Sequence, residues 1–204
     1  MALLQYERHA PKTAGATVKE SDAYVSDEIR KWVWSGFYSQ DEIQEMIEDI
    51  LEDDCDEAML RASVASQWQA KQQAEQTWPA QTDCDRLDAL FERLHAAGIC
   101  ALANAGYTMS DGHVEVNQAV ADTPDRRYHG YCFYHGQDME RAIDGGGLML
   151  AFGDLEGRED ADLAVGQQVA AALRAAGFTV DWDGTPRKRI DLPGFVWQRR
   201  ADWE

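Results

Sequence analysis

The sequence predicts an α/β (α+β) protein with a mixed, partly parallel sheet, an antiparallel C-terminal edge and a helical N-terminal region. Apolar residues recur at helical spacing through most of residues 26–98. Beyond residue 98, short apolar runs alternate with helical segments, a pattern typical of a partly parallel sheet. Val180 and Trp182 alternate with acidic residues before the turn signal Asp183-Gly184, and further apolar residues follow within 190–197, which favours a closing hairpin.

A chain of 204 residues with 45% hydrophobic residues is long enough for one sizeable core carrying a helical extension. Weak periodicity indicates a partly ordered tail over residues 1–24. We expect a helical N-terminal region, residues 25–98, packed on an α/β domain formed by residues 99–204.

Capping signals place the N-terminal helices. Ser26 is typical of an N-cap, and Gly36 can end that helix in the left-handed conformation. Ser39 and Glu42 form a capping box, and an amphipathic pattern follows it. The apolar residues of that pattern are Ile43, Met46, Ile47, Ile50 and Leu51.

Segment 41–57 contains ten acidic residues and no basic one. It lacks the central glycine of a calcium-binding EF-hand loop, so we interpret EDDCDE as the continuation of a helix with a solvated face. A further helix is expected over residues 58–76, with Ala62, Ala65 and Trp68 on one side.

The second half begins with a helix capped by Thr82 and Asp85 and ended by Gly98. Its buried stripe is Leu87, Leu90, Phe91 and Leu94. Strands are expected at residues 99–105, 131–135 and 148–152, and helices at 137–143 and 160–176. Ser110 and Asp111 can cap a helix reaching residue 121, although Val114 and Val116 also alternate like a strand. Residues 180–182, 190–192 and 195–197 supply the hairpin.

Basic residues concentrate at this hairpin, namely Arg187, Lys188, Arg189, Arg199 and Arg200. They can protect a sheet edge, pair with the acidic second helix or bind an anion. Protection of an edge is the most common of these roles.

The formal net charge of −18 disfavours nucleic acid as a partner and favours encounter with basic proteins, although solubility alone also explains such acidity. RNA binding through the basic hairpin is therefore the weakest reading. No secretory signal or membrane-spanning run is expected. Four scattered cysteines fit reduced thiols, so we expect a cytoplasmic protein without a disulfide framework or zinc site. Signatures for nucleotide binding, zinc proteases and α/β-hydrolases are lacking, and we expect no cofactor and no metal ion.

One polar cluster follows two of the predicted strands. Thr108, Ser110 and Asp111 come after the first strand, and His135, Gln137 and Asp138 come after the second. If these strands are parallel neighbours, the two groups converge at a common edge where ligands usually bind. A histidine with an aspartate could perform acid and base chemistry there. Helix capping also explains these residue types, so both interpretations stay open.

Several segments carry a family resemblance: TDCDRLDALFERLHAAGI, GYTMSDGH, GYCFYHGQDMERAIDGGGLMLAFG and VGQQVAAALRAAGFTVDWDGT. Together with the final WQRR, they resemble a bacterial family of proteins with a domain of unknown function, over about residues 24–200. That resemblance implies no activity, cofactor or site residue. In general character the chain is also similar to acidic protein inhibitors of ribonuclease E, a likeness of fold that suggests a regulatory role.

These observations favour a non-catalytic binding or regulatory protein that acts through an acidic surface on a basic protein partner. A homo-oligomer is compatible with the sequence. The alternative is a small-molecule-binding domain or enzyme with its site at the strand ends around Asp111 and His135.

Overall fold

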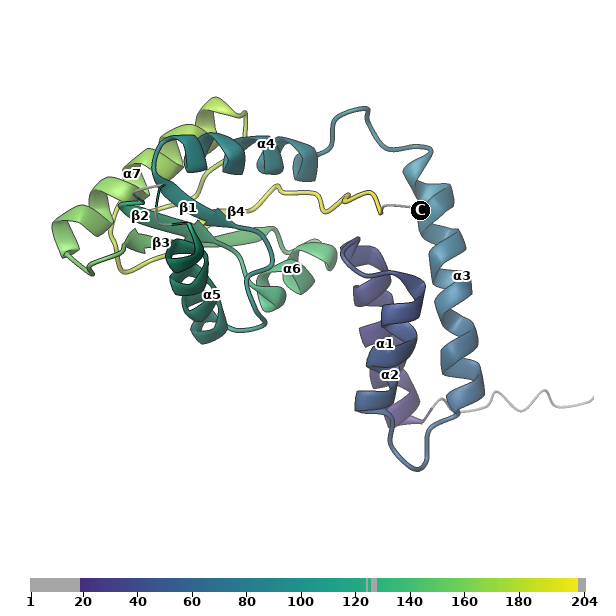
Figure 1. Ribbon diagram of the computed structural model, residues 1–204. Coiled ribbons are helices and arrows are strands. Elements are labelled where there is room, and N and C mark those ends of the chain that lie inside the picture. The colour runs from purple at the N-terminus through teal and green to yellow at the C-terminus, as the bar shows by residue number, and fades with distance from the viewer. Residues whose placement is uncertain (1–18, 124, 126–127, 202–204) are drawn as a thin grey trace, which may run out of the picture.

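A computed structural model describes residues 19–123, 125 and 128–201 of the chain, and these residues form seven helices and a four-stranded mixed sheet (Figure 1). The helices are α1 (Glu20–Ser35), α2 (Gln40–Ile50), α3 (Glu57–Glu75), α4 (Asp83–Ala96), α5 (Met109–Asp122), α6 (Gly136–Ile143) and α7 (Glu159–Ala175). The strands are β1 (Ile99–Leu102), β2 (Gly130–Phe133), β3 (Leu148–Asp154) and β4 (Ile190–Leu192). The predicted fold class is confirmed.

The strands lie in the order β1-β2-β3-β4. β1 and β2 are parallel, with Ile99 opposite Gly130, whereas β2 with β3 and β3 with β4 are antiparallel. The sheet therefore has one parallel pair at one edge and an antiparallel opposite edge, as the sequence predicts. Because β1 and β2 are parallel neighbours, the chain segments that follow them leave the sheet at the same end.

Helices cover both faces of the sheet. Buried residues of α4 and α7 share one core with Cys132 of β2, and α5 covers the other face through Val116, which packs with Phe133 (Figure 1). Adjacent residues of β2 thus face opposite cores, which is the period-two alternation expected of a strand covered on both sides.

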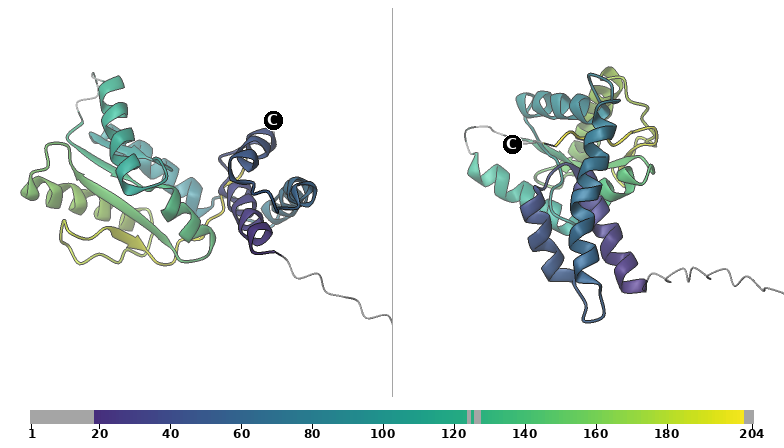
Figure 2. Two further views of the ribbon diagram at one scale, coloured as in Figure 1. Left: turned by 90° about the horizontal axis from the view of Figure 1, so that it is seen from below. Right: turned by 90° about the vertical axis from the view of Figure 1, so that its right-hand side faces the viewer.

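The helices α1, α2 and α3 form a separate bundle beside the sheet (Figure 2). Its core consists of Val25, Ile29, Val33, Ile43, Ile47, Leu60, Val64, Trp68 and Ala201. The last of these belongs to the C-terminal segment, which runs from the sheet to the bundle. Trp197 in that segment donates its Nε1 hydrogen bond to the carbonyls of Trp34 and Ser35 at 3.2 Å each, so the end of the chain ties the two parts together.

Three details of the N-terminal half differ from expectation. α1 begins at Glu20 rather than after Ser26, because Val25 extends the buried stripe one turn backwards. Segment 51–56 is irregular instead of helical, since the Asp56 side chain caps the start of α3. The expected α3 face is also wrong at Ala62 and Ala65, which are exposed. The buried α3 positions are Leu60, Val64, Trp68 and Lys71.

The capping boxes of α2 and α4 are confirmed, as is the left-handed Gly36 at the end of α1. For α5 the expected cap is wrong, because Thr108 and not Ser110 occupies the N-cap. The helical reading of this segment is correct, since Val116 is buried and Val114 is 66% exposed. Predicted strands 99–105 and 131–135 end earlier than expected, at residues 102 and 133.

The C-terminal hairpin is shorter than expected. Asp181 makes a single antiparallel bridge with Asp191, and residues 195–197 form no strand. Pro193 cannot donate to a sheet ladder, and the Phe195 N–H closes a turn on the Leu192 carbonyl. This turn directs the following residues towards α4 and the bundle.

The basic residues of that segment pair with α4, not with the acidic α2. Arg199 lies 2.6 Å from the Asp88 carboxylate, and Arg200 lies 3.1 Å from that of Asp85. Within the described chain these two arginines therefore do not make the pairing with the second helix that was one of the three roles considered for the basic residues.

Candidate functional site

The loops after β1 and β2 lie side by side. The Gly136 N–H donates to the Gly106 carbonyl at 2.8 Å, and the Gln137 N–H donates to the Tyr107 carbonyl at 3.2 Å. These bonds continue the parallel pairing beyond the strands, so the two predicted groups of polar residues start from adjacent backbone.

Thr108 and Asp111 are engaged with each other at the start of α5. The Thr108 N–H donates to Asp111 Oδ2 at 2.9 Å, and the Asp111 N–H donates to Thr108 Oγ1 at 3.4 Å. The backbone bond from Thr108 lowers the pKa of Asp111. Ser110 and Gln137 are exposed, and within the described part of the chain their side chains make no hydrogen bond. All four therefore lie at helix starts, on the surface.

His135 and Asp138 form the corresponding capping box of α6, but they are 4% and 3% exposed. The Asp138 N–H donates to His135 Nδ1 at 3.4 Å, and His135 Nε2 lies 3.2 Å from Asp138 Oδ2. Because Nδ1 accepts a hydrogen bond, we assign the ring proton of the neutral imidazole to Nε2.

Arg189 completes this cluster from the segment that precedes β4. Its NH1 group donates to both carboxylate oxygens of Asp138 at 2.8 Å, and its NH2 group contacts the sulfur of Met149 at 3.0 Å. Burial lowers the pKa of His135, with Arg189 acting in the same direction and Asp138 in the opposite one. A buried imidazole with both nitrogens engaged is poorly placed to exchange protons with a ligand.

A groove of about 540 Å³ opens directly beside these caps, between α1, the loops after β1 and β2, and α6. Its volume falls within the range of ordinary ligand sites. Four aromatic residues line it, namely Tyr24, Trp32, Tyr38 and Tyr107. Three glutamates line it too, namely Glu28, Glu115 and Glu140. Among the described residues that line it there is no lysine, arginine or histidine.

The inner carboxylates of the groove are held by a network centred on Lys31. Its ammonium group lies 2.9 Å from Glu28 Oε1 and 3.5 Å from Glu140 Oε2. The Tyr107 hydroxyl donates to the same oxygen of Glu140 at 3.4 Å. Burial raises the pKa of Glu140, and Lys31 opposes this shift. These contacts fix the orientation of both carboxylates before any ligand arrives.

Asn104 shapes the groove through its backbone. Its φ of 51° lies in the left-handed region, which asparagine adopts more readily than most residues. The turn follows β1 directly and precedes Gly106, which is also left-handed at 57°. The chain thereby reverses towards α5, and Tyr107 is left 51% exposed beside the groove.

None of the six predicted site residues lines this groove; instead, the residues next to them do. The predicted site does not include Tyr24, Glu28 and Trp32, although their spacing of four puts them on one side of α1, next to the buried stripe. This second stripe on α1 is the sequence signal from which these three lining residues could have been predicted. No local pattern could identify Arg189, which lies 51 residues from Asp138.

Among the described residues, no three His, Cys, Asp or Glu side chains are arranged to bind a metal ion. None of the helices in the described ranges combines the length and apolarity needed to cross a bilayer. Residues 18–201 match the family described as a domain of unknown function (DUF6891). Neither a curated protein nor a solved structure gives a significant match.

Proposed function

The chain belongs to the DUF6891 family, and we propose that it is a non-catalytic binding protein that takes a cationic side chain of a basic protein partner into the groove between α1 and the strand ends. The observation that carries this proposal is the lining of the groove, with four aromatic rings, three carboxylates and no basic residue among those described. Its position beyond the carboxyl ends of two parallel strands is a usual one for ligands.

The lining is suited to a guanidinium or ammonium group. Such cations are attracted to the faces of tryptophan and tyrosine rings and donate strong hydrogen bonds to carboxylates. Three carboxylates line the groove and Lys31 supplies one ammonium group in contact with two of them, so negative charge remains in excess. Glu115 on α5 is exposed and makes no ion pair with any described residue, which leaves it available to a ligand.

A protein partner fits better than a small amine because exposed tyrosine side chains lie at the rim of the groove. Tyr24 and Tyr107 are 55% and 51% exposed, and exposed aromatic residues are enriched at the centres of protein interfaces. The net charge of −18 would also steer a basic partner towards this molecule. A non-catalytic role is supported by the lining itself, in which no described residue forms a nucleophile and base pair.

The proposal includes a cytoplasmic location. It is supported by Cys55, Cys84 and Cys132, which form no disulfide within the described part of the chain. An oxidising compartment would normally favour disulfides in a chain with four cysteines.

The test is a titration of the isotope-labelled protein with a peptide of alternating glycine and arginine, followed by backbone amide chemical shifts. A matched peptide carries citrulline in place of each arginine and so lacks the charge. We expect saturable shifts at Tyr107, Gly136 and the α1 residues with the arginine peptide only. Equal shifts with both peptides, or shifts confined to α2, would contradict a cation site in the groove.

Variants sharpen the test. Glu115→Gln and Tyr24→Ala should each weaken binding by about tenfold, since each removes one exposed contact to the cation. Glu45→Gln is the matched control, because it removes the same charge from the exposed face of α2. If Glu45→Gln weakened binding as much as Glu115→Gln, general acidity and not the groove would be responsible.

A further inference from the structure

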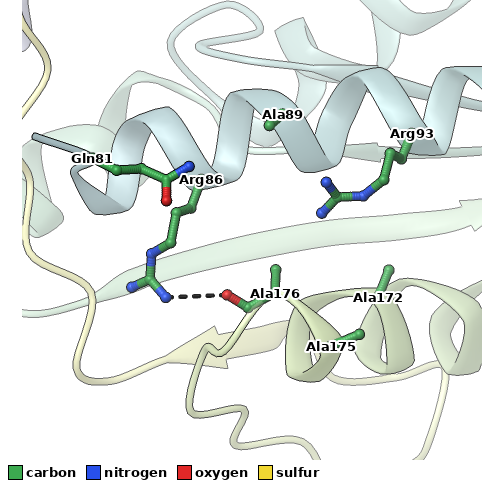
Figure 3. A pocket seen from close by; sticks show the side chains of 7 residues that line it. All are labelled: Gln81, Arg86, Ala89, Arg93, Ala172, Ala175 and Ala176. Carbon is green, nitrogen blue, oxygen red and sulfur yellow. Dashed lines mark hydrogen bonds between the residues drawn. The ribbon is translucent and has the colours of Figure 1, made fainter.

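A second groove, of about 370 Å³, lies between α4 and α7 on the face of the sheet that these helices cover (Figure 3). Arg86 and Arg93 extend from α4 towards α7, and Gln81 lies just before α4. Four alanines, namely Ala89, Ala172, Ala175 and Ala176, supply the rest of the lining. No carboxylate is among its described lining residues, although the chain has 37 acidic side chains.

Arg86 is held in place before any ligand binds. Its NH1 group donates to the Ala176 carbonyl at 3.1 Å, its NH2 group donates to Asp83 at 2.5 Å, and its guanidinium stacks on the Phe178 ring with 4.5 Å to the centroid. Three separate partners fix the plane of this guanidinium. Asp83 already balances the charge of this guanidinium, and the fixed plane orients the N–H groups of Arg86 that remain available to an anion.

Arg93 has no such partners. Within the described part of the chain, its side chain donates no hydrogen bond and forms no ion pair. Its five N–H groups face water beside the groove. Gln81 is likewise exposed, and its amide makes no hydrogen bond to any described residue.

The carbonyl groups at the end of α7, by contrast, are largely occupied. Those of Ala172, Leu173 and Arg174 accept from the turn that ends the helix, and that of Ala176 accepts from Arg86. The groove therefore presents free donors and few free acceptors. A ligand that satisfies it must bring acceptors and negative charge.

We propose that this groove binds an acidic peptide segment of a partner protein, with one carboxylate on Arg86 and another on Arg93. The two arginines are seven residues apart on α4, which separates their backbones by roughly 10 Å along the helix axis. In a peptide of polyproline II conformation, which has three residues per turn, residues three apart lie on the same side and are separated by roughly 9 Å, so the sequence pattern Glu-x-x-Glu matches. The alanine floor leaves room for the peptide backbone, and none of the described lining residues is an aromatic one that could stack on a nucleotide base.

This second site does not depend on the first, because it lies between other helices and takes the opposite charge. The probe is a Glu-Ala-Ala-Glu peptide amide that carries fluorescein on its N-terminal amine, measured by fluorescence anisotropy with the full chain. We expect it to bind at least about tenfold more tightly than the matched Gln-Ala-Ala-Gln peptide, because two charge-assisted contacts are lost in the latter. Equal binding of the two peptides would overturn the proposal. So would displacement of the peptide by inorganic phosphate at equal concentration, which would indicate an unspecific anion site.

Two variants locate the site. Arg93→Gln should weaken binding of the Glu peptide by about tenfold, and Ala175→Glu, which places a carboxylate in the groove, should abolish it. Arg174→Gln is the control, since it removes the same charge from an exposed position of α7 outside the lining. Because Arg93 and Ala175 are exposed, circular dichroism of both variants should match wild type. Unchanged binding in either variant, or an equal loss in Arg174→Gln, would reject the assignment.

Discussion

Replacement of Lys71 by methionine should change how the stability of the protein depends on pH. The Lys71 side chain is fully buried, its ammonium donates to the Val33 carbonyl at 3.1 Å, and the nearest carboxylate, that of Glu75, is 3.9 Å away. Burial lowers the pKa of Lys71 from 10.5 to about 8, and Glu75 opposes the shift. The charged form is therefore favoured in the unfolded chain.

The sign follows from proton binding. Between pH 8 and pH 10.5 the unfolded state holds more protons at this lysine than the folded state does, so stability rises with pH in that window and the penalty is fully present below pH 8. One pKa unit equals 1.36 kcal/mol, so the lowered pKa corresponds to a destabilisation of the folded protein by about 3 kcal/mol at pH 7. About 1 kcal/mol of this destabilisation is relieved by pH 9. Lys71→Met has no such dependence.

The assay is urea unfolding at pH 7, 8 and 9, monitored by circular dichroism, for wild type and Lys71→Met. The free energy of unfolding of wild type should rise by about 1 kcal/mol relative to the variant across this range. Higher pH is avoided because burial raises the pKa of Cys84 and of Tyr131 to about 12. Above the lower pKa values that these two groups have in the unfolded chain, their ionisation there would reduce the free energy of unfolding. Lys188→Met, at a lysine whose side chain is 71% exposed, is the control. A wild-type minus variant difference that stays flat or falls would refute the reasoning.

Three further substitutions test how the elements are fixed. Thr82→Ala removes the acceptor of the Asp85 N–H and should lower the free energy of unfolding by about 1 kcal/mol in urea. Gly112→Ala would place a Cβ atom 2.2 Å from the Phe133 ring, so thermal unfolding should show a loss of about 2 kcal/mol from overpacking of α5 on the sheet. Asp138→Asn removes the charged acceptor of a buried cluster and should cost about 2 kcal/mol by the same urea assay.

Each of these substitutions has a control. Thr82→Ser keeps the hydroxyl and should retain most of the stability, and a loss equal to that of alanine would argue against the cap. Asn117→Ala, on the exposed side of α5, should be nearly neutral, and a similar loss there would mean that the Gly112 effect is not steric. Asp160→Asn, at an exposed carboxylate, should lower the free energy of unfolding far less than Asp138→Asn does. Equal losses would mean that the buried cluster around Asp138 does not stabilise the fold.

Much of the fold could be predicted because its signals are local. A capping box lies within four residues, and an apolar stripe repeats every three or four, so the start of α2 and both bounds of α4 were predicted closely, whereas the end of α2 was not. The parallel pair of strands followed from the alternation of strands and helices. Where the cap was weaker the prediction failed: Lys19 makes no side-chain cap, and the start of α1 was misplaced at Ser26.

The candidate site was less accessible because it depends on contacts between distant segments. The groove combines α1 with loops after β1 and β2 and with α6, and only the two loops could be brought together by topology. Whether a polar residue after a strand faces a ligand or caps its own helix depends on side-chain direction. Sequence spacing does not give that direction, and for Asp138 it depends on Arg189, a residue distant in the sequence that donates to the Asp138 carboxylate.

The two grooves differ in how the field of the whole molecule acts on their ligands. A cation approaching the groove beside Glu115 meets attraction at long range and at contact, so its association rate should fall as salt rises. An acidic peptide approaching Arg93 meets repulsion from the net charge of −18 at long range and attraction only at contact. Salt screens the long-range term first, because exposed charges beyond about a Debye length are screened most. Both the association and the dissociation of the acidic peptide should therefore become faster at moderate salt. The association rate of the cation should fall over the same range of salt, so the opposite salt dependence of these two association rates would distinguish the two sites in one kinetic experiment.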